Sequence, residues 1–192
     1  MDKRIWVVLA LIQGMVFAGG VLGQDVAALR GRAQRQIGVL KAQMPGADKD
    51  TPLRVELGKK LYFDTLLSSD QKMSCNTCHN LNNKGGGADG EPTSLGVVGK
   101  RGGRNSPTTL NAGFQFAQFW DGRAATLEEQ AKGPILNPIE MNMPDEKLVL
   151  ERLNKHEQYP GLFKAAFPDD AQCVTYDNLA KVVGLEPHTF AQ

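Results

Sequence analysis

Cysteine is scarce in this sequence, which has only three cysteines in 192 residues. A disulfide-dense scaffold is therefore excluded, because small secreted folds of that kind need several cysteine pairs. Aromatic residues make up 7% of the chain, and no apolar run after residue 23 is long enough to cross a bilayer. The formal net charge is only +1, so the total charge does not indicate binding to nucleic acid or another polyanion.

Glycine and proline are plentiful by contrast, with 21 and 10 residues, while 41% of the chain is hydrophobic and 22% is charged. This composition is that of a globular protein rather than a disordered one. It predicts short elements joined by long loops. The clearest loop is 82–105, which carries eight glycines and no GxxxxGK[ST] phosphate-binding motif.

The first 23 residues are typical of a secretory signal peptide. A basic start, Met1–Arg4, is followed by an uncharged stretch that ends in Val21-Leu22-Gly23. An uncleaved membrane anchor is the alternative, because 19 uncharged residues could just span a bilayer. Gln13 and four glycines within the stretch favour cleavage after Gly23 and export, with no membrane attachment afterwards.

Helical spacing and capping signals predict a mostly α-helical chain. Apolar residues three and four apart predict a helix that starts at Asp25, and residues 24–50 form this leading helix and a linker. Thr51 is expected to cap a second helix, with Pro52 in its first turn. No stretch of the sequence shows a sustained alternation with a period of two, so no β-strand is predicted.

Three further helices are predicted in the second half of the chain. Thr126–Glu129 has the pattern of a capping box, and Gly133-Pro134 is expected to close the helix that it opens. Apolar spacing predicts another helix over about 144–154. The last helix begins at Thr175 and is expected to close on Gly184 and Pro187.

The sequence Cys-x-x-Cys-His occurs once, at residues 75–79, and it is the attachment signature of c-type haem. On one helical turn, positions i, i+3 and i+4 share a face. Cys75 and Cys78 can therefore form thioethers to the two haem vinyl groups, and His79 can bind the iron as its proximal ligand. The motif predicts one covalent haem c, which would also supply apolar core to a chain rich in loops.

Two other uses of the motif compete with haem attachment. A redox dithiol uses Cys-x-x-Cys, but it gives no reason for the following histidine. A zinc site needs a fourth ligand, for which the sequence offers only His156, Cys173 and His188. Cys173 receives no role of its own. The motif also leaves open whether the sixth iron position is filled, as in electron carriers, or open, as in catalysts.

Five segments resemble, in order, the bacterial di-haem cytochrome c peroxidases and the related methylamine-utilisation di-haem enzymes. They are Leu57–Asp64, Cys75–His79, Arg104–Thr108, Phe119–Ala125, and Gln130 with Asn137–Met141. The resemblance runs from about residue 53 to about 181, and it covers only the N-terminal, peroxidatic half of that family. It implies an all-α, cytochrome-c-like haem domain with long glycine-rich loops at 51–183, followed by a divergent tail at 184–192.

The resemblance implies three roles on the distal side of the haem. Glu140 would act as the general acid–base that moves a proton between the two oxygens of peroxide. Gln130 would orient peroxide or a distal water, and Pro134 would help to wall the distal pocket. Without the resemblance, Glu140 would be expected to be a solvated loop carboxylate and Gln130 an exposed helix residue.

Other roles lie outside that pocket. The resemblance implies that Trp120 assists electron passage and that Asn105 lies near the family's interdomain calcium site. Without the resemblance, Trp120 would be expected to be a core aromatic and Asn105 a turn or cap residue. Arg104, together with Lys100 and Arg101, could pair with haem propionates, although loop cations are more often simply solvated.

The chain departs from the family at Val97, which stands where many members carry the histidine that caps the resting iron. No histidine occurs between His79 and His156. We therefore expect iron that is five-coordinate or water-bound at rest rather than bis-histidine.

The chain also has no second Cys-x-x-Cys-His, and the resemblance is lost after Lys181. This predicts a truncation relative to the family, through a frameshift or a fragmentary gene. The test is to read the nucleotide sequence after codon 181 in all frames. A second haem motif there would support truncation, and its absence would favour a genuine one-haem protein.

The sequence thus favours a periplasmic peroxidase domain that reduces hydrogen peroxide to water with electrons from a small carrier such as a cytochrome c or a cupredoxin. The alternative is a one-haem electron-transfer protein in which Met141 or Met143 completes the iron, although buried packing is the commoner role of methionine. A third possibility is a non-functional fragment that binds haem poorly.

Overall fold

The structure is a computed structural model that describes residues 25–39, 41, 43–82 and 86–189. The predicted signal peptide lies outside the described residues. The chain divides into two units, 1–42 and 43–192. In the first unit the structure describes helix α2 (Val26–Ile37), which begins where the sequence predicts, with the Asp25 carboxylate accepting from the Ala27 amide at 2.9 Å. None of the residues of α2 is buried.

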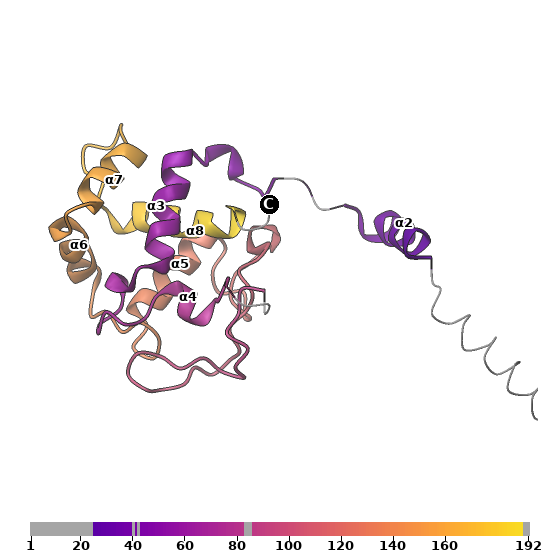
Figure 1. The fold of residues 1–192 in the computed structure, drawn as a ribbon, viewed down its shortest axis with the longest axis horizontal. Helices are drawn as coiled ribbons and strands as arrows, with labels where there is room; N and C mark the ends of the chain where they lie inside the picture. The colour runs from indigo at the N-terminus through magenta and orange to yellow at the C-terminus, as the bar shows by residue number, and fades with distance from the viewer. Residues whose placement is uncertain (1–24, 40, 42, 83–85, 190–192) are drawn as a thin grey trace, which may run out of the picture. The chain divides into compact units, whose positions relative to one another are not determined.

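The second unit is helical, as predicted (Figure 1). Its helices are α3 (Pro52–Phe63), α4 (Cys75–Cys78), α5 (Leu127–Leu136), α6 (Glu146–Lys155), α7 (Tyr159–Ala166) and α8 (Tyr176–Thr189). Single turns of 3-10 helix lie at Ala47–Lys49, Thr65–Leu67 and Ala112–Phe114. The described residues contain no β-strand, and the expectation of an all-α domain with long loops is confirmed. Within the same residues, no helix is long and apolar enough to cross a membrane.

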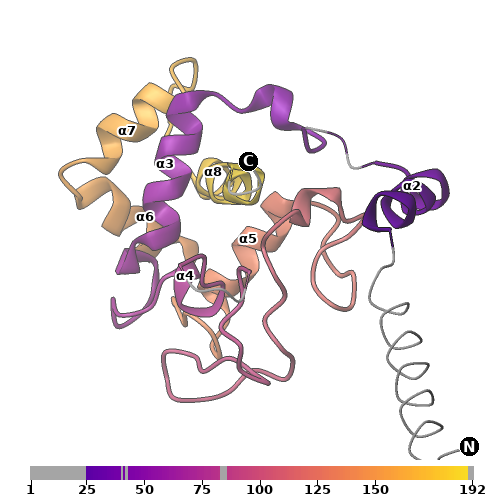
Figure 2. The same cartoon turned by 45° about the vertical axis from the view of Figure 1, so that its right-hand side comes forward.

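Helix α8 lies at the centre of the second unit. It packs against both α3 and α5, and Figure 2 shows it almost end-on between them. Leu179 and Val182 of α8 are completely buried, as are Leu61 of α3 and, to within 2%, Ile135 of α5. Burying an apolar side chain of this size contributes roughly 1.5–3 kcal/mol. The core therefore fixes α3 and α5, and α3 in turn contacts α4, which carries the haem motif.

Side-chain caps confirm two of the predicted helix starts in this unit. The Thr51 hydroxyl accepts from the amide of Arg54 at 3.3 Å, and the Thr126 hydroxyl accepts from the amide of Glu129 at 3.2 Å. The Glu129 carboxylate reaches back to the amide of Ala125 at 2.7 Å, one residue earlier than in a standard capping box. Both helices thus begin because a local side chain satisfies amides that the helix itself leaves without a partner.

The predicted end of α5 at Gly133-Pro134 is wrong. The helix continues to Leu136, and the amide of Asn137 still bonds to the Gly133 carbonyl at 3.1 Å. A proline inside a helix removes the bond to the carbonyl four residues earlier, here that of Gln130. Burial of Ile135 offsets part of this loss, because the apolar side chain is almost fully withdrawn from water.

The predicted end of α8 at Gly184 is also wrong, since the helix runs on to Thr189. A Cβ atom on Gly184 would lie 3.3 Å from backbone and side-chain atoms of Leu127. This glycine therefore allows α8 to approach the start of α5 closely, and it does not end the helix. The predicted boundary between residues 183 and 184 falls inside α8.

Helix α7 is absent from the sequence-based prediction, and side-chain bonds tie it and α6 to the end of α3. The completely buried Tyr159 of α7 donates its hydroxyl to the Asp64 carboxylate at 2.5 Å. Arg152 of α6 donates to three backbone carbonyls within Leu66–Ser69 at 2.7 to 3.1 Å. These bonds fix the chain between α3 and α4.

The glycine-rich loop meets the segment after α5 at a very close contact. A Cβ atom on Gly96 would lie 1.6 Å from the Ile139 carbonyl oxygen, so another residue fits there only if the backbone moves. The next amide, that of Val97, donates to the Glu140 carbonyl at 2.9 Å. The loop thereby holds the backbone of Ile139 and Glu140 in place.

We expect the Gly96→Ala substitution to lower the free energy of unfolding by about 2–3 kcal/mol, because the new methyl group overpacks against the Ile139 carbonyl. Chemical denaturation followed by circular dichroism measures the change. Gly103→Ala is the matched control, because a Cβ atom there meets nothing within 4 Å, and its effect should stay within about 0.5 kcal/mol. Equal stability of the two variants would contradict the close contact.

Candidate functional site

The Cys-x-x-Cys-His motif lies on and directly after α4. Cys75 and Cys78 are the first and last residues of this four-residue helix, and His79 ends it, with its amide bonded to the Cys75 carbonyl at 3.0 Å. Tyr62 of α3 anchors this end, because its hydroxyl donates to the His79 carbonyl at 2.6 Å. The structure thus brings the three predicted haem-binding residues onto one turn.

The imidazole of His79 is fixed at one of its two nitrogens. Nδ1 lies 2.9 Å from the Pro107 carbonyl oxygen and 3.1 Å from the Ser106 hydroxyl oxygen. A carbonyl can only accept a hydrogen bond, so Nδ1 carries the proton and Nε2 has the lone pair. Burial lowers the pKa of His79, while the Pro107 carbonyl, the Asp89 carboxylate and the Gly87 carbonyl oppose this; the net lowering keeps the ring neutral at neutral pH. Metal-binding histidines are held in this way through their second nitrogen.

The two thiols and the imidazole fit covalent haem better than a redox dithiol. Burial raises the pKa of the Cys78 thiol; a hydrogen bond with Ser94 reduces the rise, and repulsion from the Asp89 and Glu140 carboxylates adds to it. Redox-active cysteines have lowered pKa values, so this environment disfavours that use. All three cysteines lie in the described part of the chain, and no disulfide joins any two of them. Cys75 and Cys78 supply the two thiols that c-type haem attachment needs, and Nε2 of His79 supplies the ligand for the iron.

Glu140 lies half-buried in the segment after α5. Its Oε1 accepts from Nδ2 of Asn137 at 2.7 Å. Burial raises the pKa of Glu140, while the Asn137 amide and the Arg123 guanidinium reduce the rise. The Glu140 charge also raises the pKa of Cys78, so the carboxylate lies close to the haem motif. A carboxyl group with a raised pKa in a fixed orientation can accept and return a proton, as a general acid–base does.

Gln130 and Pro134 lie one helical turn apart on α5, so they share a face of that helix. Both residues are half-buried. The segment that carries Glu140 turns back along the end of α5, where the Met141 amide donates to the Pro134 carbonyl at 3.2 Å. The structure therefore brings Pro134 and Glu140 together, with Gln130 one turn away along α5.

The indole of Trp120 is bonded to the segment that holds His79. Its Nε1 donates to the Asn105 carbonyl at 2.8 Å, and Asn105 directly precedes Ser106 and Pro107. The residue is 64% exposed, so it is not the core aromatic that composition alone would indicate. An exposed ring that is hydrogen-bonded to the segment next to His79 suits a role in electron passage, and this role stays a prediction.

Arg104 and Asn105 have protein partners in this structure. Arg104 and Arg123 each pair with Asp121 at 2.8 Å, and their hydrogen bonds lower the pKa of Asp121 to about 2. Nδ2 of the Asn105 side chain donates to the Glu91 carbonyl at 2.6 Å. Within the described residues, no group of three His, Cys, Asp or Glu side chains is placed to hold a metal ion. The propionate contact of Arg104 and the calcium contact of Asn105 stay predictions.

Two methionines and one valine bear on the sixth ligand of the iron. Met141 and Met143, the ligands of the electron-carrier alternative, are 4% and 2% exposed and belong to the hydrophobic core. Val97 is half-buried against the same core. Val97, the residue expected to stand in place of the family's capping histidine, lies next to Glu140, because its amide donates to the Glu140 carbonyl.

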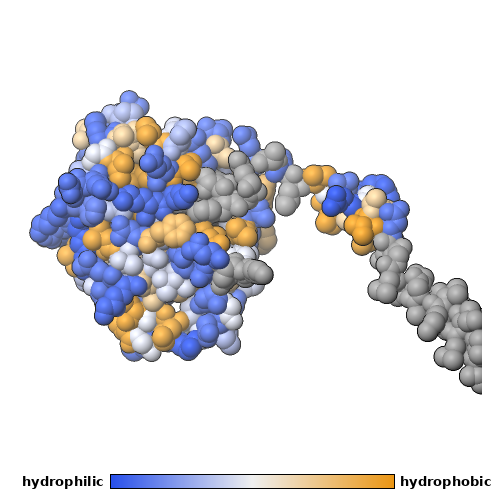
Figure 3. Space-filling view, in the orientation of Figure 1, coloured by the Kyte–Doolittle hydropathy of each residue, from blue (hydrophilic) through white to orange (hydrophobic). Residues whose placement is uncertain are grey.

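Apolar side chains remain exposed where the glycine-rich loop meets the Glu140 segment. Leu95, Val98 and Ile139 are 49%, 46% and 39% exposed, and Figure 3 shows apolar surface over the loops at the lower end of that view. A bound haem needs apolar surface of this kind, because its ring has two large apolar faces.

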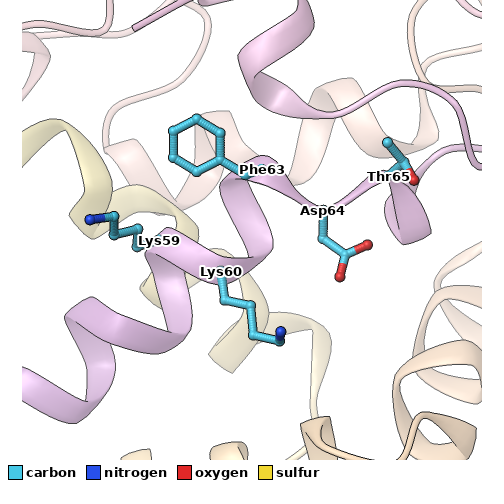
Figure 4. Close-up of a pocket in the computed structure, with 5 residues that line it drawn as sticks. All are labelled: Lys59, Lys60, Phe63, Asp64 and Thr65. Carbon is cyan, nitrogen blue, oxygen red and sulfur yellow. The ribbon is translucent and has the colours of Figure 1, made fainter. Parts of the chain in front are cut away.

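A separate open cavity of about 470 Å³ lies at the C-terminal end of α3. It is lined by Lys59, Lys60, Phe63, Asp64 and Thr65 (Figure 4). Phe63 points to the opposite side of α3 from Lys60 and Asp64. Asp64 is occupied by structural bonds to the Tyr159 hydroxyl and the Leu66 amide, and none of the predicted site residues lines this cavity.

Four residues that hold the site receive no role from the sequence. They are Tyr62, Ser106, Pro107 and Asn137. All four lie in segments that carry the family resemblance, and this was the only signal for them. Their roles depend on contacts such as those between His79 and residues 17 to 28 positions away, which no local pattern indicates.

Comparisons with known proteins agree with this geometry. The family profile described as "Di-haem cytochrome c peroxidase" matches residues 52–184. Cytochrome c551 peroxidase from Pseudomonas aeruginosa is 51% identical over 128 residues, which are 67% of this chain and 36% of that protein. Methylamine utilization protein MauG from Methylorubrum extorquens is 43% identical over 144 residues, which are 75% of this chain and 39% of that protein. The chain therefore spans less than half the length of these relatives.

Solved structures share the fold. A MauG-like protein associated with microbial copper homeostasis superposes with a TM-score of 0.70 at 24% identity, over 78% of this chain and 44% of that one. The diheme peroxidase BthA from Burkholderia thailandensis superposes with a TM-score of 0.58 at 26% identity, over 73% of this chain and 38% of that one. The expected cytochrome-c-like fold is confirmed. The chain belongs to the di-haem cytochrome c peroxidase family.

Proposed function

We propose that this chain is the peroxidatic haem part of a di-haem cytochrome c peroxidase. Cys75 and Cys78 bind one haem c through thioethers, and His79 is the proximal ligand of its iron. The substrate is hydrogen peroxide, and the electrons come from a small redox protein such as a cytochrome c or a cupredoxin. The predicted signal peptide and haem attachment both point to the periplasm.

The proposal rests on the position of Glu140, its burial and its hydrogen bond. A half-buried carboxyl group with a raised pKa lies near the haem motif and is oriented by the Asn137 amide. Family membership alone implies haem c, but a carrier of electrons has no need of a general acid–base. Met141 and Met143 pack in the hydrophobic core, so their positions do not favour the alternative of an electron carrier with a methionine ligand.

Each residue has a defined task in this proposal. The haem supplies the iron at which peroxide is bound and reduced. His79 binds through Nε2 while Nδ1 stays bonded to Pro107. Glu140 accepts the proton from one peroxide oxygen and returns it to the other, which leaves as water. Gln130 orients the substrate from α5. Reduction of one peroxide to two waters also takes two electrons and two protons, and the redox protein supplies the electrons.

Removing the acid–base group tests its task directly. We expect Glu140→Gln to slow the reaction of the haem-loaded protein with peroxide by about 10²–10⁴-fold, because the amide cannot take up the proton. Stopped-flow absorbance measures this rate. Glu128→Gln, at an exposed position on α5, is the matched control and should react like the wild type. A full rate in Glu140→Gln with intact haem content would refute the assigned role.

The pH dependence gives a second test. Glu140 must be a carboxylate to accept a proton, so the rate should rise with pH through its pKa, which burial places above the ordinary value. Asn137→Asp removes the amide donor that stabilises this carboxylate and adds a like charge, so the rise should move to higher pH. Asn154→Asp, exposed on α6, should leave the profile unchanged. An unshifted profile in Asn137→Asp would mean that another group controls the rate.

The optical spectrum tests the predicted coordination of the resting iron. The ferric protein should be high-spin, because Val97 offers no imidazole and the sequence has no histidine between His79 and His156. Val97→His should convert the spectrum toward low-spin, because it adds a ligand beside Glu140, whereas Val98→His should change it less. A low-spin bis-histidine spectrum of the wild type would overturn the prediction.

A further inference from the structure

Two oxygen atoms lie within hydrogen-bond distance of Nδ1 of His79, and a further contact of the ring, to the Gly87 carbonyl, raises its pKa. Nδ1 of His79 lies 2.9 Å from the Pro107 carbonyl and 3.1 Å from the Ser106 hydroxyl. When Nε2 binds a metal, Nδ1 must carry the only ring proton, and both oxygens then act as acceptors of one N–H group. One carbonyl is enough to fix the tautomer of a metal-binding histidine. The Ser106 hydroxyl is therefore an additional acceptor at this nitrogen.

The hydroxyl of Ser106 is held in place by its neighbours in the chain. The residue is 8% exposed, and the following proline restricts its backbone to extended conformations. Before it, the Asn105 carbonyl accepts from the Trp120 indole at 2.8 Å, and Nδ2 of the Asn105 side chain donates to the Glu91 carbonyl at 2.6 Å. These two bonds hold Asn105 through its backbone and its side chain, so the residue before Ser106 has a fixed position.

We propose that Ser106 is a positioning residue for the proximal ligand, which acts by sharing the Nδ1 proton of His79 with the Pro107 carbonyl. This inference rests on the proposed role of His79 as the iron ligand. Acceptors at Nδ1 make Nε2 a stronger electron donor to the metal. Stronger donation favours ferric over ferrous iron, so Ser106 lowers the reduction potential of the haem. It also limits rotation of the imidazole, because two acceptors on different atoms restrict the ring more than one.

The test uses the haem-loaded full chain and two measurements other than turnover. An optical redox titration gives the midpoint potential, and resonance Raman spectroscopy of the ferrous protein gives the iron–histidine stretching frequency. In Ser106→Ala the ferrous-to-ferric ratio at a fixed potential should rise about threefold, which is ~28 mV for a one-electron couple. The iron–histidine band should move to lower frequency, because the histidine has lost an acceptor.

Two further variants separate this effect from a general disturbance. Ser106→Thr keeps the hydroxyl and should return both readouts toward the wild type. Ser106→Cys replaces the hydroxyl with a weaker acceptor of similar shape, and it should shift both readouts in the same direction as Ser106→Ala even if the alanine variant loads haem poorly. Ser69→Ala is the matched control, since this half-buried serine lies in the loop after α3 and its backbone amide bonds to Met141.

The outcomes distinguish this inference from the proposed function. If the wild type carries no histidine-ligated haem, the proposed function fails and the inference falls with it. If the haem is loaded and ligated but Ser106→Ala and Ser106→Cys leave the potential and the Raman band unchanged, only the inference on Ser106 is overturned. Equal shifts in Ser69→Ala would overturn it as well, because the effect would then not come from the Nδ1 contact.

Discussion

Helix α4 has only four residues, and its position depends on hydrogen bonds that come from elsewhere in the fold. Isolated helices of this length are not stable in water, because nucleation costs more than the few internal bonds return. Tyr62 holds the end of α4 from the side of α3, and Pro107 holds the His79 ring from the long loop. The core formed by α3, α5 and α8 thus positions the first of these supports, and the loop around Pro107 supplies the second.

The segment that carries Glu140 is also positioned by contacts from elsewhere in the fold, in this case mainly backbone contacts. Glu140 lies after α5 in a stretch with no regular structure, yet it has a close neighbour in Gly96 and backbone bonds to Val97 and Asn137. A carboxyl group in a fixed, half-buried position can have a raised pKa, whereas the same group on a mobile loop would be hydrated. The long loops are therefore parts of the site and not only connections between helices.

Sequence reasoning succeeded where the signal is local. The starts of α2, α3 and α5 follow from single capping side chains a few residues from their amides, and Cys75 to His79 follow from a spacing on one turn. It failed at the ends of α5 and α8: Ile135 is buried beyond the proline of α5, and Gly184 serves a close approach of α8 to Leu127 instead of ending the helix. It assigned nothing to α7, which has only eight residues and contains Pro160 and Gly161 in its first turn. The partners of His79 and Glu140 could not be named, because they depend on which loops the fold brings together.

Trp120 gives the site a built-in optical probe. The sequence has two tryptophans, and the other, Trp6, lies outside the described residues in the predicted signal peptide. In a chain without that leader, all indole emission would come from one ring that is largely exposed and bonded to the segment holding His79. A haem attached next to that segment would accept the excitation energy, so the emission would be dim when haem is present and bright when it is absent. The fluorescence of the chain would therefore report the fraction of molecules that carry haem, before any assay of turnover.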